Sequence, residues 1–265
     1  MRRMARFEVD GIVGERWDGE GPPLVLLHAG IADRRVWRDV VPLLDAPVVA
    51  YDRRGFGETP PGPEGFSHLD DLFAVLDATV DGPAWLVGSS MGGALALDAA
   101  VTAPERLAGL VLIAPAVSGE PDPEEPDPQL ARGYAEYEAV ADDPDALVRF
   151  ETRWWLDGPD APEGRVGGAA RELALDMNRR VIANRVPEGA GHAGVDAWPR
   201  LGEIDMPVTI VCGNLDENFA VATCRAIAER IPGARFELLP GVAHLPMLEI
   251  PEELARIIGA AAAGR

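Results

Sequence analysis

The chain has 265 residues, of which 47% are hydrophobic and 26% charged, which fits one large α/β domain or a core domain that carries an insertion. No run of about 18 apolar residues is present, which argues against a membrane-spanning helix. The net charge is −20, and all 24 basic residues are arginines, so we expect repulsion of phosphate backbones and anionic lipids and no binding to nucleic acid or membranes.

The N-terminus and the cysteines bear on the cellular compartment. The arginine-rich start lacks the apolar segment of a signal peptide, so we expect a cytoplasmic protein. Cys212 and Cys224 form neither a metal-ligand spacing nor a redox pair, and no metal or cofactor is expected. We expect a small-molecule substrate as the partner, and a monomer or a homodimer.

Short apolar runs alternate with helical patterns along the chain, which predicts a mostly parallel sheet covered by helices. Residues 6–17 alternate polar and apolar around Asp10-Gly11 and predict an antiparallel hairpin. Buried strands are expected at residues 23–28, 47–52, 84–88, 107–115, 207–213 and 234–240. Helices are expected at residues 34–44, 68–80, 91–103, 220–231 and 251–264.

The alternation breaks after Ile113. Residues 118–129, "SGEPDPEEPDPQ", are too rich in proline and acid for regular structure. The segments that follow have helical patterns and no strand between them, at residues 130–140, 144–156 and 166–186. An excursion of this length predicts a helical lid inserted into an α/β core.

A glycine-rich turn, "LVGSSMGGALAL" at residues 86–97, joins a predicted strand to a predicted helix. In a Gly-x-Ser-x-Gly turn, the central serine takes a strained backbone conformation that pushes its side chain outward. Only Gly88 and Gly92 have the required spacing, so the central residue is Ser90, and we expect Ser89 to be a packing neighbour with a local hydrogen bond. The alternatives are an ordinary helix-capping turn and a phosphate cradle, although no Gly-Lys-Ser/Thr sequence is present.

A serine nucleophile needs a base, and the chain has four histidines. His244 follows the last predicted strand and precedes the final helix, which places it at the same edge of the sheet as Ser90. His28 ends a strand, His68 begins a helix, and His192 lies in the insertion, where we expect it to be solvated. We expect these three histidines to be structural.

The base in turn needs an acid to orient it. Asp216 follows the strand predicted at 207–213 and therefore lies at the carboxyl edge of the sheet, where the sites of open α/β sheets gather. Glu217 is the second candidate. An oxyanion would need two N–H donors: one from Met91 at the start of a helix, and one from the loop after the first buried strand.

These positions carry a family resemblance. With the order Ser90, Asp216, His244, the sequence resembles the α/β-hydrolase superfamily over essentially its whole length. It is most similar to cofactor-free serine esterases, enol-lactonases, C–C hydrolases and perhydrolases with a helical cap. The motifs are "LLHAG" with Trp37, "YDRRGFGET" at 51–59, "GSSMGG", "CGNLD" and "GVAHLPMLEIPEE".

The resemblance implies an α/β-hydrolase fold, with a core at 1–117 and 201–265 and a helical cap at 118–200. It also implies that Gly30 supplies the second oxyanion N–H. Two positions depart from the family pattern: Ala29 replaces a glycine, and Ala243 stands where a glycine commonly precedes the histidine. The serine nucleophile argues against the haloalkane dehalogenase and epoxide hydrolase branches, which use an aspartate.

The leading hypothesis is hydrolysis of a carboxylic ester or lactone of small to medium, largely apolar character through an acyl-enzyme. The same residues could serve a C–C hydrolase, or a perhydrolase or acyltransferase with peroxide or an alcohol as acceptor. A non-catalytic ligand receptor on the same fold is the alternative of another class.

The insertion contains candidates for a pocket lining. Packing between helices explains these apolar residues about as well as contact with a substrate does. Arg153 and Arg179 could pair with a substrate carboxylate or be ordinary surface arginines. The candidate lining residues are Phe150, Trp154, Trp155 and Met177.

Overall fold

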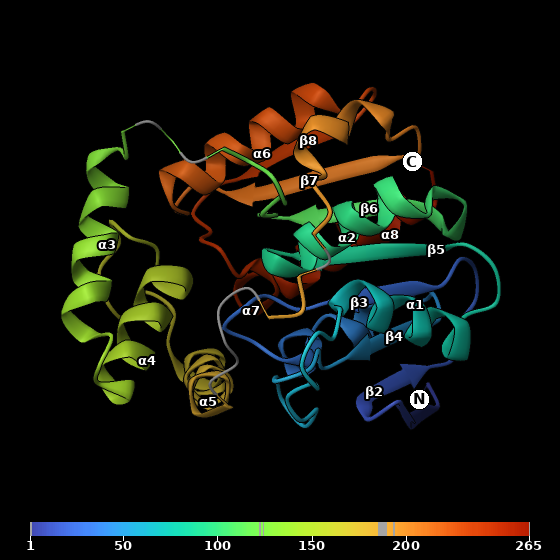
Figure 1. The fold of residues 1–265 in the computed structure, drawn as a ribbon, viewed down its shortest axis with the longest axis horizontal. Helices are drawn as coiled ribbons and strands as arrows, with labels where there is room; N and C mark the ends of the chain where they lie inside the picture. The colour runs from blue at the N-terminus through green and yellow to red at the C-terminus, as the bar shows by residue number, and fades with distance from the viewer. Residues whose placement is uncertain (1, 122, 124, 185–189, 193, 265) are drawn as a thin grey trace.

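The structure is a computed structural model that describes residues 2–121, 123, 125–184, 190–192 and 194–264. An eight-stranded sheet runs through the molecule in the order β1-β2-β4-β3-β5-β6-β7-β8 (Figure 1). β1 and β2 form the antiparallel hairpin that the sequence predicts, β2 pairs antiparallel with β4, and every other pairing is parallel. The strands are β1 Met4–Val9, β2 Ile12–Trp17, β3 Leu24–Leu27, β4 Val48–Tyr51, β5 Ala84–Ser89, β6 Leu107–Ile113, β7 Val208–Gly213 and β8 Arg235–Leu239.

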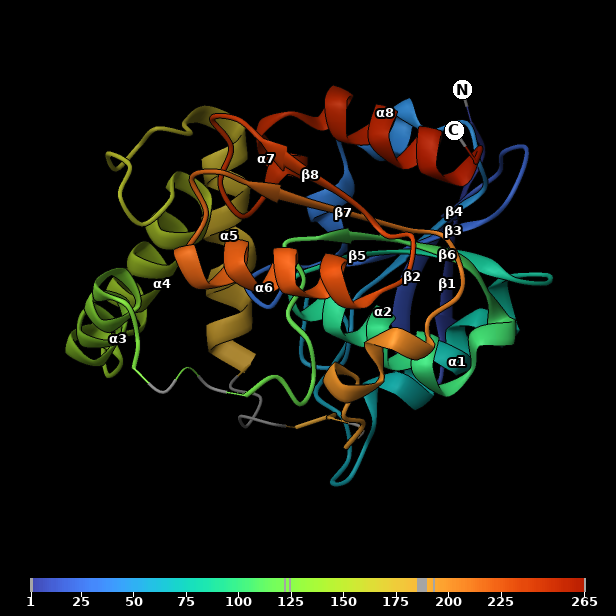
Figure 2. The same cartoon turned by 90° about the horizontal axis from the view of Figure 1, so that it is seen from above.

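Helices cover both faces of the sheet (Figure 2). One buried apolar cluster joins one face of the sheet to α1 (His68–Thr79), α2 (Met91–Thr102) and α6 (Asn218–Arg230). A second cluster joins the other face to α7 (Pro246–Glu249) and α8 (Pro251–Ala262). The runs of apolar residues in the central strands therefore exist because both faces of those strands are buried.

Two predictions about single elements are wrong. Residues 34–44 form two short 3-10 turns, η1 (Arg34–Trp37) and η2 (Val41–Leu43), and no α-helix. Pro42 has no N–H to give to a helical hydrogen bond, and the Asp33 side chain accepts the Arg35 N–H to close the first turn. β8 is not buried on both faces, because it is an edge strand whose Arg235 and Glu237 are exposed.

Between β6 and β7 the described residues contain helices and no strand. Asp127 and Asp143 each cap a helix through their side chains, and a proline occupies the first turn of both helices. These helices gather at one end of the sheet, away from α1 and α8 (Figures 1 and 2). They are α3 (Pro128–Val140), α4 (Pro144–Thr152), the π-helical turn η4 (Arg153–Asp157) and α5 (Gly168–Asn184). Two further 3-10 turns lie next to strands: η3 (Pro104–Arg106) precedes β6, and η5 (Trp198–Glu203) precedes β7.

No helix in the described part of the chain is both long and apolar enough to span a bilayer.

Candidate active site

Ser90 stands in the turn between β5 and α2. Its φ of 53° and ψ of −117° lie in a region that non-glycine residues rarely adopt. The turn is held by the Ser90 N–H, which donates to the Ile113 carbonyl at 2.9 Å, and by the Ser90 carbonyl, which accepts the Gly93 N–H at 2.8 Å. Ser90 is the N-cap of α2, yet its hydroxyl makes no capping hydrogen bond. The strained turn therefore leaves the hydroxyl available for chemistry.

Three glycines allow this turn to form. A Cβ on Gly88 would collide with the Gly92 carbonyl, and one on Gly92 would collide with the carbonyl of Leu27 at the end of β3. A Cβ on Gly93 would lie 2.6 Å from Pro115 Cβ. Each contact is backbone or ring, so none can move aside for a side chain.

Ser89 lies at the end of β5 and is fully buried. The sequence predicts a local hydrogen bond for this residue, but its Oγ has no partner in the described residues. The prediction is wrong, because the hydroxyl is buried at the end of β5 without a partner in the described residues.

Asp216 and His244 follow two neighbouring parallel strands and meet at the carboxyl edge of the sheet. Asp216 follows β7, His244 follows β8, and His244 Nδ1 lies 2.7 Å from Asp216 Oδ2. Asp216 Oδ1 accepts the Glu217 N–H at 2.7 Å. A carboxylate at Nδ1 favours the tautomer with its proton on Nδ1, which leaves Nε2 as the basic nitrogen.

Glu217, the second candidate acid, faces a different neighbour. Its Oε1 accepts a hydrogen bond from Trp154 Nε1 at 3.2 Å, and both side chains are buried. Burial raises the pKa of the Glu217 carboxyl. Glu217 therefore fastens α6 to the helical segment, and the geometry favours Asp216 as the partner of His244.

The π-helical turn η4 contacts the candidate base directly. The ring of Trp155 lies 4.5 Å from the ring of His244, and the Trp155 carbonyl accepts the His244 N–H at 3.2 Å. Single π-turns occur frequently at functional sites. The inserted helices thus reach the carboxyl edge of the sheet at His244.

The other histidines lie elsewhere. His28 is fully buried, and burial, followed by the nearby Arg53, lowers its pKa well below the usual value. His68 begins α1, where Ser67 caps the helix, and burial lowers its pKa to about 3. Both are therefore neutral at pH 7, and His192 is exposed as predicted.

Gly30 and Met91 lie side by side. A Cβ on Gly30 would lie 2.5 Å from Met91 Sδ, so the thioether covers the glycine. Neither the Gly30 N–H nor the Met91 N–H has a hydrogen-bond partner in the part of the chain that the structure describes. The site therefore offers two backbone N–H donors without described partners, one on the residue after Ser90 and one on the glycine that the Met91 thioether covers.

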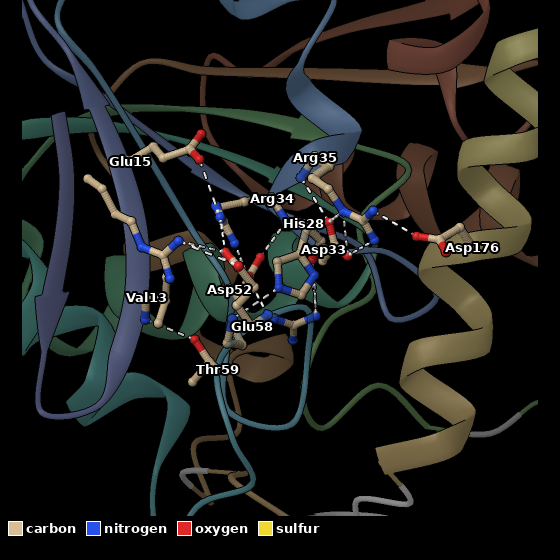
Figure 3. Close-up of polar contacts among 12 residues, drawn as sticks. Val13, Glu15, His28, Asp33, Arg34, Arg35, Asp52, Glu58, Thr59 and Asp176 are labelled. Atoms are coloured by element: carbon tan, nitrogen blue, oxygen red, sulfur yellow. Dashed lines mark hydrogen bonds and ion pairs between the residues drawn. The ribbon is translucent and has the colours of Figure 1, made fainter. Parts of the chain in front are cut away.

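Residues 28–33, which follow β3 and are called the β3 loop below, lead into a partly buried group of charges (Figure 3). The Arg34 guanidinium contacts the carboxylates of Asp52 and Glu58 and lies 3.3 Å from Glu15 Oε1. Asp52 Oδ1 also accepts the Arg34 N–H at 2.8 Å. These four residues, the Arg34 cluster, join the end of the β3 loop to β2 and to the segment after β4.

A second arginine joins the β3 loop to the inserted helices. Arg35 pairs with Asp33 at 2.6 Å and with Asp176 of α5 at 2.7 Å (Figure 3). This pairing draws the pKa of the Asp176 carboxyl below its usual value. The loop with the candidate oxyanion donor is therefore tied to α5.

The candidate lining residues of the insertion lie mostly in packed surroundings. Trp154 is 2% exposed and packs against Gly133, and Phe150 contacts the rings of Trp154 and Tyr137. Met177 is 1% exposed and belongs to the second apolar cluster. Of the four, Trp155 contacts His244, and Trp154 contacts the second candidate acid, Glu217.

The two arginines suggested for a substrate carboxylate differ. Arg153 already contacts the carboxylate of Glu136. Arg179 is exposed on α5.

A cavity of about 390 Å³ borders Met91, the residue after Ser90, and its lining residues include none of Ser90, Asp216 and His244. Its wall includes Met91, apolar side chains of α1 and α2, and polar residues, among them Arg53, His68 and Asp98. Burial raises the pKa of Asp98 to about 6. A larger hollow of about 860 Å³ lies between the start of β3 and α8, and it contains neither Ser90 nor His244.

The described residues contain no group of three or more His, Cys, Asp or Glu side chains arranged to hold a metal ion. The chemistry that the site offers is that of a hydroxyl, an imidazole, a carboxylate and two backbone N–H groups.

Comparison with known proteins agrees with this architecture. The alpha/beta hydrolase family model matches residues 24–257. Pimeloyl-(acyl-carrier protein) methyl ester esterase of Aeromonas hydrophila is 28% identical over 260 residues, which cover 91% of this chain and 95% of that protein. 2-Hydroxy-6-oxo-6-phenylhexa-2,4-dienoate hydrolase of Comamonas testosteroni is 28% identical over 255 residues, 90% of this chain and 87% of that protein.

A solved esterase structure from a Rhodococcus species superposes with a TM-score of 0.75 at 26% identity, covering 99% of this chain and 98% of that one. The family match spans most of the chain, and the sheet order, the strained serine turn and the Asp216–His244 pair fit it. The chain belongs to the α/β-hydrolase family and is an enzyme of its ester-hydrolase type.

Proposed function

We propose that the protein hydrolyses a carboxylic ester or lactone of small to medium, largely apolar character through an acyl-enzyme on Ser90. The observation that carries the proposal is the position of three features at the carboxyl edge of one sheet. These are the strained Ser90 turn, the 2.7 Å Asp216–His244 contact, and the unpaired Gly30 and Met91 N–H groups. The curated esterase relative supports an ester as the substrate.

In the acylation step, Ser90 Oγ attacks the carbonyl carbon while His244 Nε2 takes the hydroxyl proton. The carbonyl oxygen becomes an oxyanion, which the N–H groups of Gly30 and Met91 stabilise. His244 then gives its proton to the departing alkoxide as the C–O bond breaks. Asp216 holds the imidazole in the required tautomer throughout.

In the deacylation step, water replaces the alcohol. His244 takes a proton from the water as its oxygen attacks the acyl carbon, and the same two N–H groups stabilise the second oxyanion. The proton then returns to Ser90 Oγ as the acyl bond breaks, which releases the carboxylic acid and restores the enzyme.

We further propose that residues 118–200 act as a cap over this site, with residues 1–117 and 201–265 as the core. The contact of Trp155 with His244 and the ion pair of Arg35 with Asp176 support this division, because both connect the inserted helices to the catalytic edge. A cavity of about 390 Å³ beside Met91 suits a small to medium acyl group.

The test is a panel of aryl and alkyl esters and lactones of increasing acyl length, run with wild type, Ser90→Ala and Ser89→Ala. We expect Ser90→Ala to lose turnover by at least about 10⁴-fold and Ser89→Ala to stay near wild type. Near-full turnover by Ser90→Ala would exclude the acyl-enzyme. Turnover of no ester or lactone by the wild type, together with tight reversible binding of one of them, would favour the receptor alternative.

A further inference from the structure

Arg53 is a buried cation with an unusual set of partners. Its side chain is 2% exposed, and in the described part of the chain no carboxylate lies within ion-pair distance of it. Its neighbour Arg54 pairs with Asp71 at 2.9 Å. A buried charge without a counter-ion is costly, so its retention calls for another role.

The partners of Arg53 are carbonyl oxygens of the β3 loop. Arg53 Nη2 donates to the His28 carbonyl at 3.0 Å and to the Ala29 carbonyl at 3.3 Å. The guanidinium lies 4.7 Å from the ring centre of Phe56, which covers one face of it. Burial lowers the pKa of Arg53 to about 10, so the side chain is still a cation at pH 7.

The His28 ring contacts both Arg53 and the Ala29 carbonyl. The Arg53 backbone N–H donates to His28 Nε2 at 3.1 Å, so the neutral ring carries its proton on Nδ1. Nδ1 lies 2.8 Å from the Ala29 carbonyl oxygen and donates to it. Arg53 thus acts on Ala29 twice, once through its guanidinium and once by setting the tautomer of His28.

The Ala29 carbonyl and the Gly30 N–H belong to one peptide plane. The described residues contain no cis peptide bond, and in a trans peptide the N–H points opposite to the carbonyl. Donors that fix the direction of the Ala29 carbonyl therefore also fix the direction of the Gly30 N–H. The Ala32 N–H, at 3.3 Å, is a further donor to that carbonyl.

We propose that Arg53 is a positioning residue for the oxyanion hole, because it holds the Ala29–Gly30 peptide in the orientation that presents the Gly30 N–H to the reaction. A positive charge at the carbonyl also polarises the peptide and strengthens its N–H as a donor. The effect belongs to the transition state, where the oxyanion exists, and not to the bound ester. This inference rests on the proposed function.

The experiment compares Arg53→Met with Arg54→Met. We expect Arg53→Met to lower kcat for an aryl ester by about 10- to 100-fold and to leave KM within about twofold, because a misoriented donor weakens oxyanion stabilisation. Arg54→Met, which loses an ion pair in the same segment, should keep kcat near wild type. Arg53→Lys should recover part of kcat, because an ammonium can still donate to one carbonyl.

A second readout separates positioning from general damage to the fold. A boronic acid forms a tetrahedral adduct with the serine and places an oxygen where the oxyanion forms. Its affinity should fall in Arg53→Met by a factor close to the fall in kcat. If Arg53→Met does not fold, kcat and the boronic acid affinity are measured on Arg53→Lys instead.

Three outcomes would overturn the inference: an Arg53 variant with unchanged kcat, an equal loss in Arg54→Met, or a loss confined to KM. If Ser90→Ala is inactive while Arg53→Met keeps full kcat, this inference fails and the proposed function stands. If Ser90→Ala keeps its activity, the proposed function itself fails.

Discussion

Arg34 and Arg53 are both buried, yet one is surrounded by carboxylates and the other by carbonyl oxygens. Although burial lowers the pKa of Arg34, the charges of Asp52, Glu58 and Glu15 outweigh it and raise the pKa. Burial without a counter-ion lowers the pKa of Arg53 to about 10. The first arginine joins strands and loops, whereas the second lies against the β3 loop.

The two arginines differ in whether carboxylates compensate their buried charge. Around Arg34 the charges are mutually paired, which is how buried ions avoid a net cost. At the candidate site the Ser89 hydroxyl, the Gly30 N–H and the Met91 N–H lack partners in the described residues. We therefore expect changes at the site to affect catalysis and changes in the Arg34 cluster to affect stability.

The largest expected effect lies on the catalytic side. Asp216→Asn should lower kcat by about 10⁴-fold, because an amide at this position favours the wrong tautomer of His244, and should change the unfolding midpoint little. Glu217→Gln is the matched control and should stay within a few-fold of wild type, since its oxygen can still accept from Trp154. Steady-state kinetics on one aryl ester decides this; a larger loss in Glu217→Gln would reverse the two roles.

The Arg34 cluster should show the opposite pattern. Arg34→Met leaves the buried Asp52 carboxylate without its cation, so we expect the free energy of unfolding to fall by about 3 kcal/mol. kcat of the folded fraction should stay within a few-fold of wild type. Urea unfolding measures the first quantity. Arg256→Met, which breaks an exposed pair with Glu253, should leave the midpoint unchanged, and an equal loss there would contradict the assignment.

The pH dependence of stability should report the burial of His68. His68 has a pKa of about 3 in the folded state, caused by burial and then by Arg53, so the unfolded chain takes up a proton on this residue below about pH 6.5 while the folded chain does not. Stability should therefore fall as the pH drops through this window.

The measurement is urea unfolding of wild type and His68→Gln at pH 7 and pH 5. We expect wild type to lose up to about 2 kcal/mol more than the variant between the two values. Equal losses would show that His68 titrates alike in both states.

The smallest effect is expected at Ser89. Ser89→Ala removes a buried hydroxyl that has no partner, so the free energy of unfolding should rise by about 0.5 to 1 kcal/mol with kcat near wild type. Thermal unfolding and ester kinetics check both. A loss of stability would mean that the hydroxyl is satisfied in solution.

The fold and the enzyme class were largely predictable. Long apolar runs specify the central strands because these are buried on both faces, and the comparisons confirm the α/β-hydrolase prediction and the ester-hydrolase type. The helix predicted at 34–44 was wrong, because helical periodicity does not account for Pro42 or for the side-chain cap of Asp33. The strand predicted at 234–240 is present as β8, and only its expected burial on both faces was wrong, because apolar content does not reveal an edge position.

Some residues of the candidate site could be predicted from the sequence and others could not. Glycine spacing marked Ser90, and position after a strand marked Asp216 and His244; their catalytic roles stay predictions. Arg53 lies within the motif "YDRRGFGET", which does not by itself indicate a role for this residue. Its partners are carbonyls about 24 residues away, a contact that neither spacing nor hydrophobic pattern encodes.

The central claim is that Ser90 is the nucleophile, and covalent labelling tests it most directly. A fluorophosphonate probe is incubated with wild type, Ser90→Ala and His244→Ala, and mass spectrometry of the digested protein locates the adduct. We expect one adduct, on Ser90, which is absent in Ser90→Ala and forms much more slowly in His244→Ala. A wild type that stays unlabelled, or an adduct on another residue that persists in Ser90→Ala, would contradict it.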